Sequence, residues 1–216
     1  MVLIGGVGRS GTHLLANILK SHPDLTVDIE REPQFTWAVN SVVWGRDITK
    51  LINLYKTKPV NYVTKDHPMM WQFHLLNAHI PTLKMIIMQR GAHQVVASSL
   101  QHAGVRQWVV NSALYPPNPL TGSLHPRFKD NLSVAEKLTL RWHLHANEVR
   151  ALAKFNNVLV VDYNALLTRP DTILAALSNF LDIPNNFTFP TLNQASLFKW
   201  VHQLNPQQLQ EINDIL

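Results

Sequence analysis

Residues 1–13 read MVLIGGVGRSGTH, and this stretch decides the fold class. Its first four residues are apolar and β-prone, and after the glycine-rich run leucine and isoleucine recur at helical spacing over residues 14–19. The pattern predicts a strand, a tight loop from Gly5 to His13 and then a helix. Such a loop can turn its backbone N–H groups towards an anion, which also meets the positive end of the following helix.

Three further segments have the short, apolar character of buried parallel strands. They are residues 61–64, 83–89 and 158–163, and helical patterns cover residues 94–102, 134–155 and 207–216. This alternation predicts a three-layer α/β fold, with a central parallel sheet flanked by helices. We expect a single domain over residues 1–216, because a chain of this length suits one core.

The composition narrows the classes of protein. Hydrophobic residues make up 46% of the chain, and 19 Lys and Arg against 14 Asp and Glu give a net charge of +5. That excess suits an anionic ligand without distinguishing a nucleotide from a nucleic acid or an acidic glycan. Because there is no Cys, disulfides, thiolate metal sites and a catalytic Cys are excluded. No apolar run approaches the roughly 18 residues of a membrane span, so we expect a soluble, cytoplasmic protein.

The loop has the spacing of a nucleotide-binding P-loop but lacks two of its functional side chains. Gly6 and Gly11 are correctly spaced, whereas Thr12 stands in place of the Lys and His13 in place of the Ser or Thr that holds Mg²⁺. The anion-binding part of the motif is therefore kept and the metal-holding part is not. Arg9 supplies a fixed cation inside the loop instead. A P-loop nucleotide kinase remains an alternative that these departures disfavour.

The run Arg9-Ser-Gly-Thr12 resembles the 5'-phosphosulfate loop of the bacterial-type, PAPS-dependent sulfotransferase family, where PAPS is 3'-phosphoadenosine 5'-phosphosulfate. The resemblance extends over nearly the whole chain and implies a P-loop NTPase-like topology. It implies PAPS as co-substrate, PAP as product, a hydroxyl- or amine-bearing acceptor and no required metal. The residues it assigns to the 5'-phosphosulfate are Arg9, Ser10, Gly11 and Thr12, and Gly8 and His13 of the same loop are further candidate cofactor-binding residues. His13 departs from the Thr or Ser that is usual in the family.

A second anion site follows the third predicted strand. Arg90 ends that strand, and Ser98 lies eight positions later in the next helix, so both can face the crevice at the carboxyl edge of the sheet. This Arg and Ser pattern resembles the family's 3'-phosphate site, although Gly91-Ala92 replaces its usual Asp-Pro or Asn-Pro. The resemblance also implies that Tyr163 lies beside the adenine.

Sulfuryl transfer needs cations at the transferred group and a base for the acceptor proton. Arg9 and Lys65 are the candidate cations, since the family has a Lys after the second strand. Glu32 and His67 compete as base: Glu32-Pro-Gln-Phe35 resembles the segment that carries the catalytic Glu in bacterial members, and Lys65-x-His67 resembles the small-molecule enzymes. We favour Glu32, with His67 close behind and Glu30 as a weaker third candidate.

Other readings stay open. A non-catalytic, polyanion-binding protein would use the basic surface, but no nucleic-acid module is recognisable and no nucleic-acid partner is expected. The histidines lack a metal-ligand spacing with a supporting acid, so no metal site is expected. The proline-rich segment 115–126 is a loop that either covers an acceptor site or is an idle surface excursion. Neither the acceptor nor the oligomeric state is readable from these patterns.

Overall fold

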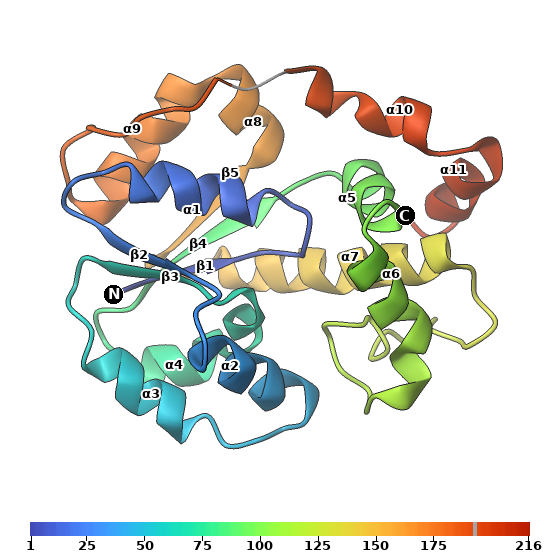
Figure 1. The fold of residues 1–216 in the computed structure, drawn as a ribbon, viewed down its shortest axis with the longest axis horizontal. Coiled ribbons are helices and arrows are strands. Elements are labelled where there is room, and N and C mark those ends of the chain that lie inside the picture. The colour runs from blue at the N-terminus through green and yellow to red at the C-terminus, as the bar shows by residue number, and fades with distance from the viewer. Residues whose placement is uncertain (192–193) are drawn as a thin grey trace.

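A five-stranded, wholly parallel sheet forms the centre of the molecule (Figure 1). The structure is a computed structural model and describes residues 1–191 and 194–216. The strand order is β2-β3-β1-β4-β5. The strands are β1 (Val2–Gly5), β2 (Thr26–Ile29), β3 (Tyr62–Lys65), β4 (Lys84–Gln89) and β5 (Val158–Asp162).

Helices cover both faces of the sheet, as the alternating side chains of a strand require. Leu3 of β1 faces a core made with α2, α3, η1, α4 and the end of α7, whereas Ile4 faces a core made with α1, α8 and α9. The three-layer α/β prediction is therefore confirmed. The bounds are α1 (Thr12–Lys20), α2 (Gln34–Val43), α3 (Thr49–Lys56), η1 (His67–Gln72), α4 (Phe73–His79), α7 (Val134–Leu152), α8 (Tyr163–Thr168) and α9 (Pro170–Leu181).

A third apolar cluster lies beyond the carboxyl ends of the strands, on the right of Figure 1. It joins the first half of α7 to α5 and α6 and to the C-terminal segment. Capping boxes begin α7 at Ser133 and α11 at Asn205, which accounts for the sharp start of both helices. The additional elements are α5 (Ala92–Leu100), α6 (Ala103–Val110), η2 (Asn111–Leu114), η3 (Gln194–Leu197), α10 (Lys199–Gln203) and α11 (Pro206–Asn213).

The four predicted strands are confirmed to within two residues, but β2 was missed. Thr26 is exposed and the other three residues, Val27–Ile29, are only partly buried, because β2 lies at the edge of the sheet and pairs with β3 alone. Such a strand lacks the continuous apolar run of a central parallel strand. The omission matters for the site, because β2 sets the position of Glu30, the residue that directly follows the strand.

The proline-rich segment 115–126 is irregular, as predicted, and it is partly buried and not a surface excursion. Asn118 and Thr121 are almost fully buried, and their side chains make a local network with Ser123. Gly122 has φ of 86°, and a β-carbon there would lie 2.8 Å from the Cα of Arg141. The segment is therefore packed directly against α7.

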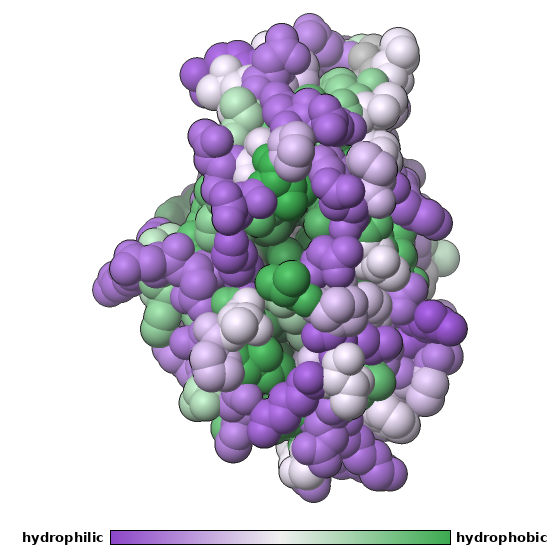
Figure 2. All heavy atoms as spheres, turned by 90° about the vertical axis from the view of Figure 1, so that its left-hand side faces the viewer, coloured by the Kyte–Doolittle hydropathy of each residue, from purple (hydrophilic) through white to green (hydrophobic). Residues whose placement is uncertain are grey.

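The amino ends of the strands form the opposite side of the molecule, which Figure 2 shows. Hydrophilic residues cover most of that side, with hydrophobic groups exposed between them. A hollow of about 240 Å³ between β1, β4 and the end of α9 includes Met1, Leu25 and Val60 in its lining. Within the described residues, no helix combines the length and apolar character needed to cross a bilayer.

Candidate active site

The loop between β1 and α1 is shaped by backbone conformations that favour glycine. Gly6 has φ of 135°, and a β-carbon there would lie 2.6 Å from the backbone oxygen of Met88. Gly11 has φ of 102°, and its β-carbon would lie 2.6 Å from the ring of Tyr163. No side chain caps the start of α1, so its first N–H groups are available to a ligand. Ser10 is fully buried, and its hydroxyl has no partner among the described residues.

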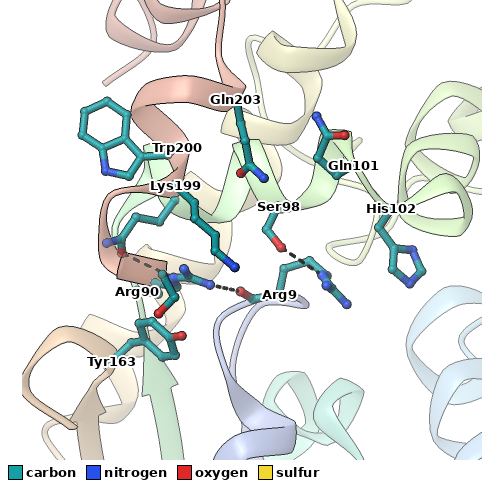
Figure 3. A pocket seen from close by; sticks show the side chains of 11 residues that line it. Arg9, Arg90, Ser98, Gln101, His102, Tyr163, Lys199, Trp200 and Gln203 are labelled. Atoms are coloured by element: carbon teal, nitrogen blue, oxygen red, sulfur yellow. Dashed lines mark hydrogen bonds between the residues drawn. The ribbon is translucent and has the colours of Figure 1, made fainter. Parts of the chain in front are cut away.

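Arg9 and Arg90 connect the two anion sites expected from the sequence (Figure 3). The Nε of Arg9 donates to the hydroxyl of Ser98 at 3.2 Å, and Nη1 of Arg90 donates to the carbonyl oxygen of Arg9 at 3.1 Å. The guanidinium carbon of Arg90 lies 4.0 Å from the centre of the Tyr163 ring. The structure therefore brings the predicted residues Arg9, Arg90, Ser98 and Tyr163 together at the carboxyl edge of the sheet.

Two neighbouring cavities share these four residues. The smaller, of about 190 Å³, also contacts Gly11, Thr12 and His13 at the start of α1. The larger, of about 320 Å³, extends from Arg9 and Arg90 towards α10. The two cavities therefore lie next to each other, one at the start of α1 and the other towards α10.

The C-terminal segment supplies part of the larger cavity, a contribution that the sequence did not reveal. Lys199, Trp200 and Gln203 of α10 line it, and the Lys199 side chain extends towards Arg9 and Arg90 (Figure 3). Lys199-Trp200 is a basic and aromatic pair in a polar tail, but it lies more than a hundred residues from Arg90 in sequence. Only the folded chain shows that they meet.

Glu30, Lys65 and His67 form a charged cluster beside the loop. In the β2–β3 pairing Ile29 is opposite Lys65, so Glu30 follows at the end of the strand. The side chain of Lys65 is 3% exposed and donates a short hydrogen bond to Oε1 of Glu30. Nδ1 of His67 lies 3.1 Å from the same oxygen, and Nε2 of His13 lies 3.8 Å from Oε2.

The pKa values in this cluster follow from burial and pairing. Burial alone would raise the pKa of Glu30, but hydrogen bonds from His67 and Lys65, with the charge of Lys65, lower it to about 2. Burial, aided by the charge of Lys65, lowers the pKa of His67 against the opposing effect of Glu30. His67 is therefore neutral at pH 7. Because the ionised Glu30 only accepts hydrogen bonds, Nδ1 of His67 carries the proton and Nε2 keeps its lone pair.

Glu32, the favoured base in the sequence interpretation, lies outside this cluster. It is exposed, and none of the hydrogen bonds or ion pairs found among the described residues involves it. Glu30, the weakest of the three candidates, occupies the position between Lys65 and His67. Glu30 and not Glu32 reaches the cluster because β2, which was not predicted, continues as far as Ile29 and ends directly before Glu30.

A buried polar network supports the cluster from behind. Asp66 is 1% exposed, and its Oδ2 accepts hydrogen bonds from Tyr55 and Thr64, both at 2.8 Å, and from Gln34 at 3.2 Å. Burial raises the pKa of Asp66. This network ties the start of α2 to the end of β3, the two segments that flank His67. Among the described residues, no group of three or more His, Asp and Glu side chains is arranged to hold a metal ion.

Comparisons with solved structures show the same fold. The sulfotransferase domain from the curacin biosynthetic pathway superposes with a TM-score of 0.65 at 13% identity, covering 99% of this chain and 96% of that one. A sulfotransferase from Alicyclobacillus acidocaldarius gives 0.58 at 14% identity, covering 99% and 94%. A mouse sulfotransferase complexed with PAP gives 0.56 at 15% identity, covering 99% and 82%. At these identities the likeness concerns the fold alone.

The sequence itself was compared with curated proteins and with family models. None of the curated proteins matches it at a significant level. The model of the sulfotransferase domain, however, matches residues 1–214. Since that match takes in nearly all of the polypeptide, the chain belongs to the sulfotransferase family.

Proposed function

We propose that this protein, as one domain, transfers a sulfuryl group from PAPS to a hydroxyl or amine of an acceptor. The observation that carries the proposal is the pair of adjoining cationic cavities, linked through Arg9 and Arg90, beside the Glu30, Lys65 and His67 cluster. The chemistry of the lining fits the nucleotide. The buried Ser10 hydroxyl and the uncapped start of α1 suit the 5'-phosphosulfate, and Arg90 with Ser98 suits the 3'-phosphate.

Each residue then has a defined task. When bound, PAPS supplies the sulfuryl group. This group passes to the acceptor oxygen while the bond between its sulfur and the 5'-phosphate oxygen breaks. Nε2 of His67 takes the acceptor proton, while Glu30 holds the imidazole in the tautomer that leaves Nε2 free. Lys65 and Arg9 stabilise the negative charge that develops on the transferred group and on the departing phosphate. Glu30 is thus a positioning residue in this proposal.

His67 is a better base than either glutamate for a physical reason. Glu30, with a pKa of about 2 and two strong donors on one oxygen, has little tendency to take a proton. Glu32 is exposed to solvent and has no contact that would direct it to the reaction centre. A neutral imidazole with one free nitrogen meets both the protonation and the orientation requirement.

The direct test of the donor compares nucleotides. PAP is expected to raise the melting temperature by several degrees at concentrations at which ATP with Mg²⁺ has little effect, because two phosphate pockets are present and the P-loop Lys is not. Thermal shift measurements with PAP, AMP and ATP check this, followed by an acceptor screen with labelled PAPS. A preference for ATP with Mg²⁺ would instead support the kinase alternative.

Lys199 provides a second test, of the 3'-phosphate pocket. Lys199→Ala is expected to weaken PAP binding about fivefold to tenfold, since a partly screened cation on one phosphate is lost. AMP, which lacks the 3'-phosphate, should lose much less. Calorimetric titrations of both nucleotides measure the difference, with the exposed Lys20→Ala on α1 as control. Equal losses for the two nucleotides would mean that Lys199 does not recognise the 3'-phosphate.

A further inference from the structure

Arg141 of α7 is a buried cation without a counter-ion. The residue is 5% exposed, and no ion pair between it and any described carboxylate is present. Its Nε donates to the carbonyl oxygen of Leu120 in the proline-rich segment. Neither Nη1 nor Nη2 has a hydrogen-bond acceptor among the described residues, so four N–H donors of the guanidinium are free.

An unpaired charge in this position is costly. Burial lowers the pKa of Arg141 to about 10, so the group still carries its proton at neutral pH. Proteins usually compensate buried charges with partners. The neighbours that Arg141 affects electrostatically, His67 and His145, are themselves kept neutral by burial and supply no negative charge. No described carboxylate therefore compensates the charge of Arg141, which leaves its free N–H groups to solvent or to a bound anion.

The free end of the guanidinium points at the phosphate loop. A β-carbon added to Gly8 would lie 3.1 Å from Nη2 and 3.8 Å from Nη1 of Arg141. Unlike Gly6 and Gly11, Gly8 does not have a positive φ, so the backbone conformation does not require glycine there. The Arg141 side chain comes close, however, so its Nη2 would have to shift slightly to make room for a side chain at this position. Nη2 of Arg141 thus lies beside Gly8, which precedes Arg9, and the charge of Arg141 helps to lower the pKa of His67.

We propose that Arg141 and the backbone at Gly8 form a third oxyanion site, separate from the two phosphate pockets. The inference rests on the proposed function and deepens it. A guanidinium with four free donors suits a sulfonate, sulfate or carboxylate bound through two oxygens. Two sources can supply that group: the sulfonate of the donor, or an acidic group that the acceptor carries beside its nucleophile.

Sulfate is the probe for this site. It is titrated against the wild type, Arg141→Gln and Arg141→Lys, both in saturating PAP and without nucleotide, and the melting temperature reports binding. With PAP present, Arg141→Gln is expected to bind sulfate about 10- to 100-fold more weakly, and Arg141→Lys to lie in between. Arg150→Gln is the matched control, because Arg150 is an exposed arginine on the same helix.

The stability of the free protein separates a ligand site from a purely structural tie. If Arg141 binds an anion, Arg141→Gln removes an uncompensated charge, and the melting temperature without sulfate should stay level or rise. If Arg141 serves only to hold Leu120, Arg141→Gln should lower the melting temperature while the affinity for sulfate is unchanged. That second result, or the same sulfate affinity in wild type and Arg141→Gln, overturns the proposal.

Gly8→Ala keeps the test decisive if Arg141→Gln does not fold. The backbone at Gly8 accepts alanine, and the added methyl group would sit against Nη2 without removing the charge. Gly8→Ala is expected to lower sulfate affinity at least tenfold in the PAP complex, because its methyl group would crowd the Nη2 donor of Arg141. Undiminished sulfate binding by Gly8→Ala contradicts a site at this position.

Two comparisons then distinguish the sulfonate of the donor from an acidic group of the acceptor: Kd for PAPS against Kd for PAP, and KM for carboxylated against KM for uncharged acceptors. If the ligand is the donor's sulfonate, Arg141→Gln raises Kd for PAPS more than Kd for PAP. If it is an acidic group of the acceptor, that ratio is unchanged, and KM rises for carboxylated acceptors but not for uncharged analogues. If the wild type does not bind PAP, the proposed function is wrong but the Arg141 site is still tested. The sulfate titration without nucleotide compares wild type with Arg141→Gln independently of PAP. No change in either ratio would leave an adventitious ion only and overturn the inference.

Discussion

His67→Asn is expected to lower kcat by about 10²- to 10⁴-fold and to leave the affinity for PAP within twofold of the wild type. Asparagine can still donate to Glu30 from the position of Nδ1, but it offers no nitrogen that takes up a proton. The loss should therefore appear in the chemical step alone. Single-turnover kinetics with labelled PAPS, beside titration with PAP, measure the two quantities separately.

Two glutamate variants serve as matched controls for that experiment. Glu32→Gln should keep kcat within about twofold, since Glu32 is exposed and has no contact with the cluster. Glu30→Gln should lower kcat, but by less than His67→Asn, because it weakens the orientation of the imidazole without removing the base. An inactive Glu32→Gln beside an active His67→Asn would restore Glu32 as the base and remove His67 from that role.

The phosphate loop was predictable from local sequence because its requirements are local. The conformations at Gly6 and Gly11 exclude most side chains, and the spacing to α1 follows from the turn itself. The apolar runs of β1, β3, β4 and β5 were equally readable, since strands buried on both faces leave a continuous pattern. These features are sufficient to place Arg9, Arg90 and Ser98 at one edge of the sheet.

The residues that the sequence analysis ranked too low or did not name depend on long-range contacts. Glu30 lies at the site only because the edge strand β2 pairs with β3 in a register that sets Ile29 opposite Lys65. Lys199 and Arg141 reach the site from α10 and α7, whose directions are decided by packing in the third apolar cluster. Patterns along the chain indicate that such helices exist, but not which polar residue on them faces the loop.

Lys65→Met should have the other large effect, a fall in kcat of about 10²- to 10³-fold, because a buried cation at the reaction centre is replaced by an apolar chain of similar length. The exposed Lys56→Met of α3 is its control and should be unaffected. PAP binding should change little in either variant, since Lys65 lines neither nucleotide cavity.

The pH dependence of Lys65→Met identifies the base independently. Activity requires neutral His67, so in the wild type it should be flat at neutral pH and fall in acid, as pH drops through a pKa that lies below 6.5. The charge of Lys65 is one of the causes that lower this pKa, and Glu30 opposes it. Removing Lys65 removes one of the lowering causes while burial and Glu30 remain, so the pKa of His67 rises and the acidic limb of kcat/KM moves to higher pH. If a glutamate were the base, the loss of a neighbouring cation would again raise its pKa, but from a starting point far below that of an imidazole. An acidic limb that lies below pH 6.5 and moves upward in Lys65→Met is therefore expected for His67, and a limb that stays in place when Lys65 is removed would rule His67 out.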